Sequence, residues 1–163
     1  MMTNSINDIL EAMDENWPQC ADTVSPALLR LLRVSNLFHN QMETLVQRYN
    51  LQRAEFSVLA TLRRSPIPYC LSPTALSQSM IFSSGGLTKV LHRLNQAELI
   101  ERVDNLEDKR SKLVQLTSTG KQLIETVMPQ LHQKERNVLS VLSPDEQQQL
   151  NSFMRRILEA HEP

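Results

Sequence analysis

The chain has 163 residues, of which 40% are hydrophobic and 4% aromatic, and it contains 3 glycines. A chain of this kind can bury a real core as one domain, so the composition argues against disorder and against an all-β fold. The formal net charge of -1 hides an asymmetry, because the first 24 residues hold five acidic residues and no Lys or Arg. The rest of the chain has 17 basic and 13 acidic residues, a mildly basic balance that permits nucleic-acid binding without requiring it.

The sequence gives no signal for a membrane, secretory or catalytic role. No basic stretch precedes an apolar segment at the N-terminus, and no run approaches the roughly 18 apolar residues of a membrane span. We therefore expect a cytoplasmic protein with no membrane partner. The two cysteines and four scattered histidines match no metal-ligand spacing, and no phosphate-binding loop or nucleophile elbow is present. We expect neither an enzyme nor a bound metal or cofactor.

Apolar residues recur at three- and four-residue spacing between residues 25 and 50, which predicts a long amphipathic helix. Ser25 can cap this helix, and Pro26 suits its first position. A second helix is predicted to begin near Arg53 and to end at the prolines of SPIP, and residues 69–71 could form a very short strand.

Two short helices joined by a tight turn are predicted for residues 72–97. Ser72 can cap the first, and Ser83 or Ser84 can cap the second. Leucines then recur on one face of the second helix. The opposite face carries Gly85, Thr88, Lys89, His92 and Gln96. This pattern predicts a helix-turn-helix.

Residues 99–104 and 111–116 are strand-like runs separated by the polar stretch NLEDKR, which predicts a β-hairpin. Thr117 can cap the helix that follows, and Pro129 is predicted to bend that helix. The stretch SPDE, residues 143–146, predicts a capping box at the start of a last helix. The expected fold class is therefore mostly α with a small β-hairpin wing, which is a winged helix-turn-helix.

A helix-turn-helix places the first turns of its second helix against the base edges and phosphates of duplex DNA. Four small residues stand at those turns and let backbone N–H groups approach phosphate: Ser83, Ser84, Gly85 and Gly86. We expect Thr88 and Lys89 to contact base edges and Arg93 to contact a phosphate, with His92 beside them on the exposed face. The competing interpretation of these polar residues is an ordinary solvated helix face.

The hairpin loop adds Lys109, Arg110 and Lys112 to the expected DNA-binding set. A loop beside a recognition helix can place Arg110 in the neighbouring minor groove, where narrow A·T-rich stretches concentrate negative potential. Asp108 precedes Arg110 by two residues, and its carboxylate can pair with a nearby Arg or cap the turn. We therefore expect Asp108 to hold the loop in shape.

The stretch LSPTALSQSMIFSSGGLTKVLHRLNQAELIERV, followed by DKRSKLVQLTSTG, resembles the MarR family of winged helix-turn-helix regulators. The resemblance covers about residues 25–160, and its most specific element is the D-x-R motif with LTSTG. It implies a homodimer that binds a palindromic double-stranded DNA operator and usually represses until a small-molecule effector or an oxidant acts. The expected organisation is a single domain, 1–163, with an acidic extension (1–24), dimerisation helices (25–50 and 117–160) and a winged helix-turn-helix (53–116).

Within the family, DILEAMDENWPQ and EFSVLATLRRSPIPYCLSPTALS are similar to the urate-responsive branch, which implies a ligand site made of a Trp, an Asp and an Arg. Trp17 matches the Trp, whereas Ser57 aligns with the Asp and Val90 with the Arg. Since two of the three residues differ, we expect a less charged ligand than urate in the same cleft, between the dimer helices and the recognition helix.

Two other functions remain open from the sequence. A redox-sensing regulator would use a reactive thiol, here Cys20 or Cys70, although Cys20 precedes the first long helix and Cys70 lies in an apolar strand context. A winged helix can also serve only as a protein-interaction module. Specific duplex binding that weakens steeply with salt would separate a DNA-binding protein from such a module.

Overall fold

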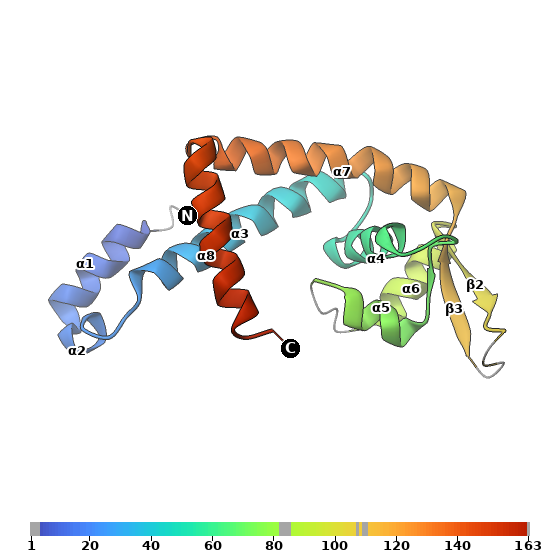
Figure 1. Ribbon diagram of the computed structural model, residues 1–163, viewed down its shortest axis with the longest axis horizontal. Helices are drawn as coiled ribbons and strands as arrows, with labels where there is room; N and C mark the ends of the chain where they lie inside the picture. Colours follow the sequence, from blue (N-terminus) through green and yellow to red (C-terminus); the bar gives the residue numbers. More distant parts are fainter. Residues whose placement is uncertain (1–3, 82–85, 107, 109–110, 163) are drawn as a thin grey trace. The chain divides into compact units, whose positions relative to one another are not determined.

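The computed structural model describes residues 4–81, 86–106, 108 and 111–162. The chain forms two compact units, Met1–Thr44 and Leu45–Pro163, and each is considered separately. Figure 1 follows the elements along the chain, which are mostly helices with one small antiparallel sheet. The expected fold class is thereby confirmed.

The N-terminal unit contains α1 (Ile6–Asn16), α2 (Pro18–Ala21) and most of α3 (Pro26–Gln47). A capping box starts α1, because Asp8 N donates to Ser5 Oγ at 3.0 Å and Ser5 N donates to Asp8 Oδ2 at 2.7 Å. The first long helix was predicted from its apolar spacing, whereas α1 and α2 were expected only as an acidic extension.

Two arginines of α3 form hydrogen bonds with residues in α1 and just before it. Arg30 Nη2 donates to Asn7 Oδ1 at 3.2 Å, and Arg33 Nη2 donates to the backbone oxygen of Asn4 at 3.2 Å. The N-terminal segment is therefore fixed to α3 by polar contacts within its own unit.

The C-terminal unit contains five complete helices and the sheet. The helices are α4 (Arg53–Arg64), α5 (Pro73–Ser79), α6 (Leu87–Gln96), α7 (Ser118–Leu139) and α8 (Pro144–Glu159). The strands are β1 (Cys70–Leu71), β2 (Ile100–Asp104) and β3 (Lys112–Leu116). The sheet order is β1-β3-β2, and β3 pairs antiparallel with both neighbours, with Val114 opposite Leu71 and Arg102.

The core of this unit is built around α4, which packs against α5, α6, α7 and β3. Each of these elements contributes fully buried side chains, among them Leu59, Leu62, Leu76, Leu91, Leu94, Val114, Ile124 and Val127. Burial of Leu91 and Leu94 fixes the rotation of α6, so the opposite face of α6 points to solvent.

The start of α6 differs from the sequence-based prediction. The helix begins at Leu87, and Gly86 occupies the N-cap position with a left-handed φ of 93°. A left-handed residue interrupts the helical backbone, and glycine adopts this conformation without a steric penalty. The prediction that Ser83 or Ser84 caps this helix was therefore wrong, and the two serines themselves lie outside the described residues.

The start of α7 agrees with the prediction. Thr117 Oγ1 accepts from Gly120 N at 3.0 Å and donates to the Glu98 backbone oxygen at 2.8 Å. A Cβ at Gly120 would lie 2.0 Å from the backbone oxygen of Leu99, so only glycine allows this close approach. Ser72 and Ser143 also cap their helices as predicted, and α7 continues through Pro129.

Candidate nucleic-acid interface

The outward face of α6 is polar and lacks acidic residues. Thr88, Lys89 and His92 are exposed, and the Arg93 side chain is 50% exposed at the edge of this face. The core-facing residues of the same helix are Val90, Leu91 and Leu94. Gly86, at the N-cap, is exposed, and a Cβ built on it would have no atom within 4 Å. Another molecule can therefore come close to the backbone at this position.

Arg93 has an intramolecular partner that the sequence did not reveal. Its Nε lies 3.0 Å from Oε1 of Glu55, a side chain on α4 that is only 4% exposed. The other oxygen, Oε2, accepts the backbone N–H of Gln52 at 2.7 Å and so caps α4. The capping role could have been inferred from the position of Glu55 three residues after Gln52, but the pairing with Arg93 depends on tertiary packing.

Arg64, on α4, forms a hydrogen bond with the end of α5, the first helix of the helix-turn-helix. Its Nη2 donates to the backbone oxygen of Ser79, at the end of α5, and also lies 3.2 Å from Thr61 Oγ1. The side chain of Arg64 therefore holds the end of α5, the first helix of the helix-turn-helix, to α4.

The hairpin carries the wing, and its described residues close the loop by hydrogen bonds. Asn105 Nδ2 donates to Ser111 Oγ at 2.9 Å, while Ser111 N and Ser111 Oγ donate to the Asp108 backbone oxygen at 3.0 and 3.1 Å. Lys112 forms a cross-strand ion pair with Asp104. Asp108 thus takes part in the turn through its carbonyl group.

Five of the predicted DNA contacts lie outside the described residues. They are Ser83, Ser84, Gly85, Lys109 and Arg110. Their roles stay predictions. The described members of the set fall into two places, with Gly86, Thr88, Lys89, His92 and Arg93 on α6 or its cap and Lys112 on the wing strand.

A charged cluster joins α4, the β1 strand start and α7. Arg63 Nε lies 2.7 Å from Glu125 Oε1, and the Arg63 guanidinium lies 4.9 Å from the centroid of the Tyr69 ring. Lys121 Nζ lies 5.8 Å from the same ring. The hydrogen bond to Glu125, the largest cause, raises the pKa of Arg63, so this guanidinium stays charged at any working pH.

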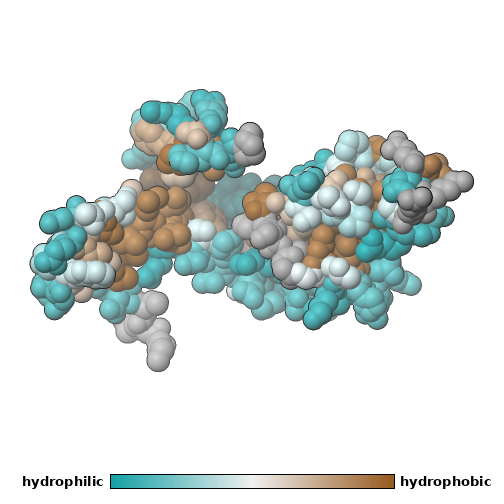
Figure 2. Space-filling model, turned by 90° about the horizontal axis from the view of Figure 1, so that it is seen from below, coloured by the Kyte–Doolittle hydropathy of each residue, from teal (hydrophilic) through white to brown (hydrophobic). Residues whose placement is uncertain are grey.

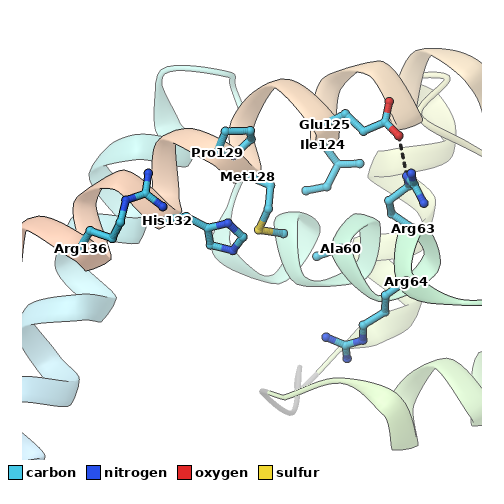
Figure 3. Close-up of a pocket in the computed structure, with 9 residues that line it drawn as sticks. All are labelled: Ala60, Arg63, Arg64, Ile124, Glu125, Met128, Pro129, His132 and Arg136. Atoms are coloured by element: carbon cyan, nitrogen blue, oxygen red, sulfur yellow. Dashed lines mark hydrogen bonds and ion pairs between the residues drawn. The ribbon is translucent and has the colours of Figure 1, made fainter. Parts of the chain in front are cut away.

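A groove of about 560 Å³ lies between α4 and α7. Its lining residues are Ala60, Arg63, Arg64, Ile124, Glu125, Met128, Pro129, His132 and Arg136. In Figure 3 the side chains of Met128 and His132 extend from α7 toward the groove, and the Arg63–Glu125 pair stands at one end. The groove combines an apolar floor with several basic groups.

The three residues predicted for a ligand site are not brought together in this groove. Ser57 and Val90 are buried on α4 and α6, which contact each other, at 8% and 9% exposure. Trp17 belongs to the N-terminal unit and is 62% exposed. None of the three lines the groove between α4 and α7.

The two cysteines are free and half-buried. Burial and, to a lesser extent, the nearby Glu101 carboxylate raise the pKa of the Cys70 thiol, so Cys70 is poorly suited to act as a thiolate near neutral pH. Among the residues that the structure describes, no cluster of three His, Cys, Asp or Glu could hold a metal ion. Within the same residues, no helix has the length and apolar character needed to cross a membrane.

Comparison with known proteins agrees with this geometry. The model of the MarR family matches residues 51–112, which cover α4 to the start of β3. The HTH-type transcriptional regulator PecS of Dickeya dadantii is 33% identical over 154 residues, covering 93% of this chain and 92% of PecS. The multiple antibiotic resistance protein MarR of Escherichia coli is 28% identical over 139 residues, covering 80% and 92% of the two chains.

A solved structure shows the same fold bound to nucleic acid. Sco3205, a MarR family regulator from Streptomyces coelicolor solved in complex with DNA, superposes with a TM-score of 0.73 at 23% identity over 84% of this chain and 86% of that one. The helix pair, the wing and the near full-length match to PecS lead to one assignment: the chain belongs to the MarR family and is a helix-turn-helix transcriptional regulator.

Proposed function

We propose that the protein represses transcription by binding a palindromic operator as a homodimer, with α6 in the major groove and the wing beside it. The observation that carries this proposal is the acid-free polar face of α6, backed by Leu91 and Leu94 in the core. Thr88 and Lys89 contact base edges, and Arg110 of the wing adds a minor-groove or phosphate contact.

Exposed apolar side chains support the homodimer. In the N-terminal unit Trp17, Leu28, Leu31, Leu32, Val34 and Leu37 are exposed, and on α8 Phe153, Ile157 and Leu158 are about half exposed. Figure 2 shows apolar side chains at the surface of the N-terminal unit. Apolar surface of this extent on α3 and α8 is suited to burial against a second copy, as the dimerisation assignment of residues 25–50 and 117–160 requires.

Binding to the DNA that flanks the protein's own gene tests the proposal. Fluorescence anisotropy should give specific binding that weakens steeply as salt rises, and footprinting should protect two half-sites about one helical turn apart. Arg110→Ala should weaken binding by about 1 to 3 kcal/mol, whereas Arg155→Ala, on the exposed face of α8, should not. A monomer on a single half-site, or no salt-sensitive duplex binding, would contradict the proposal.

The groove between α4 and α7 is the candidate effector site. Arg63, Arg64, His132 and Arg136 line it, Glu125 is the one acidic residue in the described lining, and the floor is apolar. This chemistry fits a small organic anion with an apolar body, more charged than the ligand expected at Ser57 and Val90. Because Arg64 also holds the end of α5, an anion that binds Arg64 in the groove displaces the end of α5, which precedes α6 along the chain.

A panel of small carboxylates, each paired with its neutral amide, tests this site. Carboxylates should raise the melting temperature and weaken DNA binding more than their amides do. Arg64→Gln should abolish the effect on DNA binding, while Arg156→Gln on α8 should leave it intact. If no compound of the panel changes the melting temperature or the DNA affinity, the groove is not an effector site for these compounds. The DNA-binding proposal would still stand.

The localisation and the absence of catalysis are proposed from the role in DNA binding. The relatives are bacterial transcriptional regulators, so we place the protein in the cytoplasm and assign it no catalysis. A Cys-based redox response is the second candidate, which peroxide treatment with thiol rescue would test, and the raised pKa of Cys70 disfavours that residue as the sensor.

A further inference from the structure

Glu55 is a buried carboxylate whose two oxygens have different partners. Oε2 accepts the backbone N–H of Gln52 at 2.7 Å, and Oε1 lies 3.0 Å from Arg93 Nε. Only 4% of the Glu55 side chain is exposed, so its charge is compensated by these partners and hardly by water. The only buried polar or charged side chains found in the described part of the chain are Glu55, Ser57 and Thr61, all on α4.

Arg93 keeps hydrogen-bonding capacity beyond this ion pair. A guanidinium has five N–H donors, and a single carboxylate that also serves Gln52 cannot accept all of them. Half of the Arg93 side chain is exposed, at the edge of the polar face of α6. An arginine held on one edge is suited to bind an outside anion with the other edge, because much of its side-chain entropy is already lost.

The charges along α6 point to the same kind of partner. Lys89 and Arg93 are four residues apart on one helix, where like charges repel, and α6 contains no acidic residue. Glu55 offsets part of this repulsion from inside the protein. A phosphate group would offset the rest from outside.

We propose that Glu55 is a positioning residue for DNA binding, which holds Arg93 so that the outer N–H groups of its guanidinium contact a backbone phosphate beside the major groove. This inference rests on the proposed operator binding and adds a residue that does not itself touch DNA. It makes an unusual prediction, because removing a carboxylate near DNA ordinarily strengthens binding by reducing repulsion, whereas loss of Glu55 weakens it.

The test compares Glu55→Gln and Arg93→Lys with the unchanged protein on the same flanking duplex, over a range of salt concentrations. Gln keeps an acceptor and removes the charge, and Lys keeps the charge and can still pair with Glu55 but lacks a second edge of donors. Each variant should lose about three- to tenfold in affinity. In Arg93→Lys the slope of log affinity against log salt should also become shallower by up to about 0.9.

Three controls separate positioning from stability and from net charge. Glu11→Gln removes an exposed carboxylate from α1, outside the winged helix-turn-helix and the helices assigned to dimerisation, and should leave DNA affinity unchanged. Glu55→Gln combined with Arg93→Lys should bind no more weakly than Arg93→Lys alone, since Glu55 acts through Arg93. Urea unfolding of each variant confirms that binding is measured on folded protein.

The outcomes are distinct. If Glu55→Gln binds as tightly as the unchanged protein, or if Arg93→Lys keeps both affinity and salt slope, the positioning role is overturned while operator binding stands. A comparable loss in Glu11→Gln also overturns it, because the effect is then one of charge alone. An unchanged protein that binds no duplex contradicts the proposed function, and this inference falls with it.

Discussion

Gly120 occupies a site where the backbone of α7 touches the backbone before β2. A Cβ there would lie 2.0 Å from the Leu99 oxygen and 2.9 Å from Leu116 Cδ1. We expect Gly120→Ala to lower the free energy of unfolding by about 3 kcal/mol, because a backbone oxygen cannot move away as a flexible side chain can. Urea unfolding monitored by circular dichroism measures this loss.

Gly86 provides the matched control. A Cβ at Gly86 meets nothing within 4 Å, but the φ of 93° disfavours any side chain. Gly86→Ala should therefore cost only about 1 kcal/mol of backbone strain. If both alanine variants are equally stable, the close approach of Gly120 to Leu99 does not exist in solution.

Cys70 should react slowly at neutral pH. Burial and Glu101 raise the pKa of its thiol, so the reactive thiolate forms only above the usual range of about 8.5. In a Cys20→Ser background, the rate of iodoacetamide alkylation should rise with pH and reach half its maximum above that value. Rapid alkylation at pH 7 would contradict this and would favour the redox alternative.

At the scale of elements, the capping box of α8 makes stability depend on pH. Ser143 N donates to Glu146 Oε2 at 2.7 Å, and this backbone hydrogen bond, followed by that of the Ser143 hydroxyl, lowers the pKa of Glu146. A carboxyl whose pKa is lower in the folded state stabilises above its unfolded pKa of about 4.3, and that stabilisation is lost as the pH falls through the folded-state pKa.

Comparison of Glu146→Gln with the unchanged protein checks this dependence. The unchanged protein should be the more stable of the two at pH 7, and the difference should shrink as the pH falls below about 4.3. Urea unfolding of both proteins at several pH values gives their free energies of unfolding and the difference between them. A difference that is the same at pH 7 and pH 3 would show that the Glu146 charge does not cap α8.

Features that depend on neighbouring residues were predictable from the sequence, and those that depend on tertiary packing were not. Ser72, Thr117 and Ser143 cap helices as predicted, because a cap bonds to a backbone N–H three residues away. The hairpin was predicted within one residue at each strand start. The later start of α6 escaped prediction, because the sequence does not specify that Gly86 takes the left-handed conformation.

The same distinction applies to the candidate site. The exposed set on α6 follows from helical periodicity, so Thr88, Lys89 and His92 could be identified. The partner of Arg93 could not, because Glu55 lies on another helix and only the packing of α4 against α6 brings the two together. The groove between α4 and α7 escaped prediction for the same reason.

At the scale of the whole molecule, the exposed apolar residues of α3 should hold two copies together. Leu28 and Leu32 are 57% and 62% exposed and lie one turn apart. Leu28→Asp with Leu32→Asp should weaken the dimer at least about 100-fold, since burying each leucine contributes about 1.5 to 3 kcal/mol. Sedimentation velocity over a dilution series measures the change.

Ile67→Asp is the control for this prediction. Ile67 is 80% exposed, but it lies in the connection between α4 and β1, outside the segments assigned to dimerisation. Its charged variant should sediment as the unchanged protein does. Dimers that persist in the double α3 variant would place the interface elsewhere.

The junction of α7 with the hairpin has a mechanical consequence. Thr117 is bonded to Glu98, and Gly120 lies against Leu99, so the first turn of α7 and the base of the wing move as one piece. With 22 residues, α7 is a rod about 33 Å long. A swing of about 5° at one end displaces the other by about 3 Å. A small molecule that binds beside α7 and rotates it slightly therefore shifts the position of the wing, although the molecule does not contact the wing.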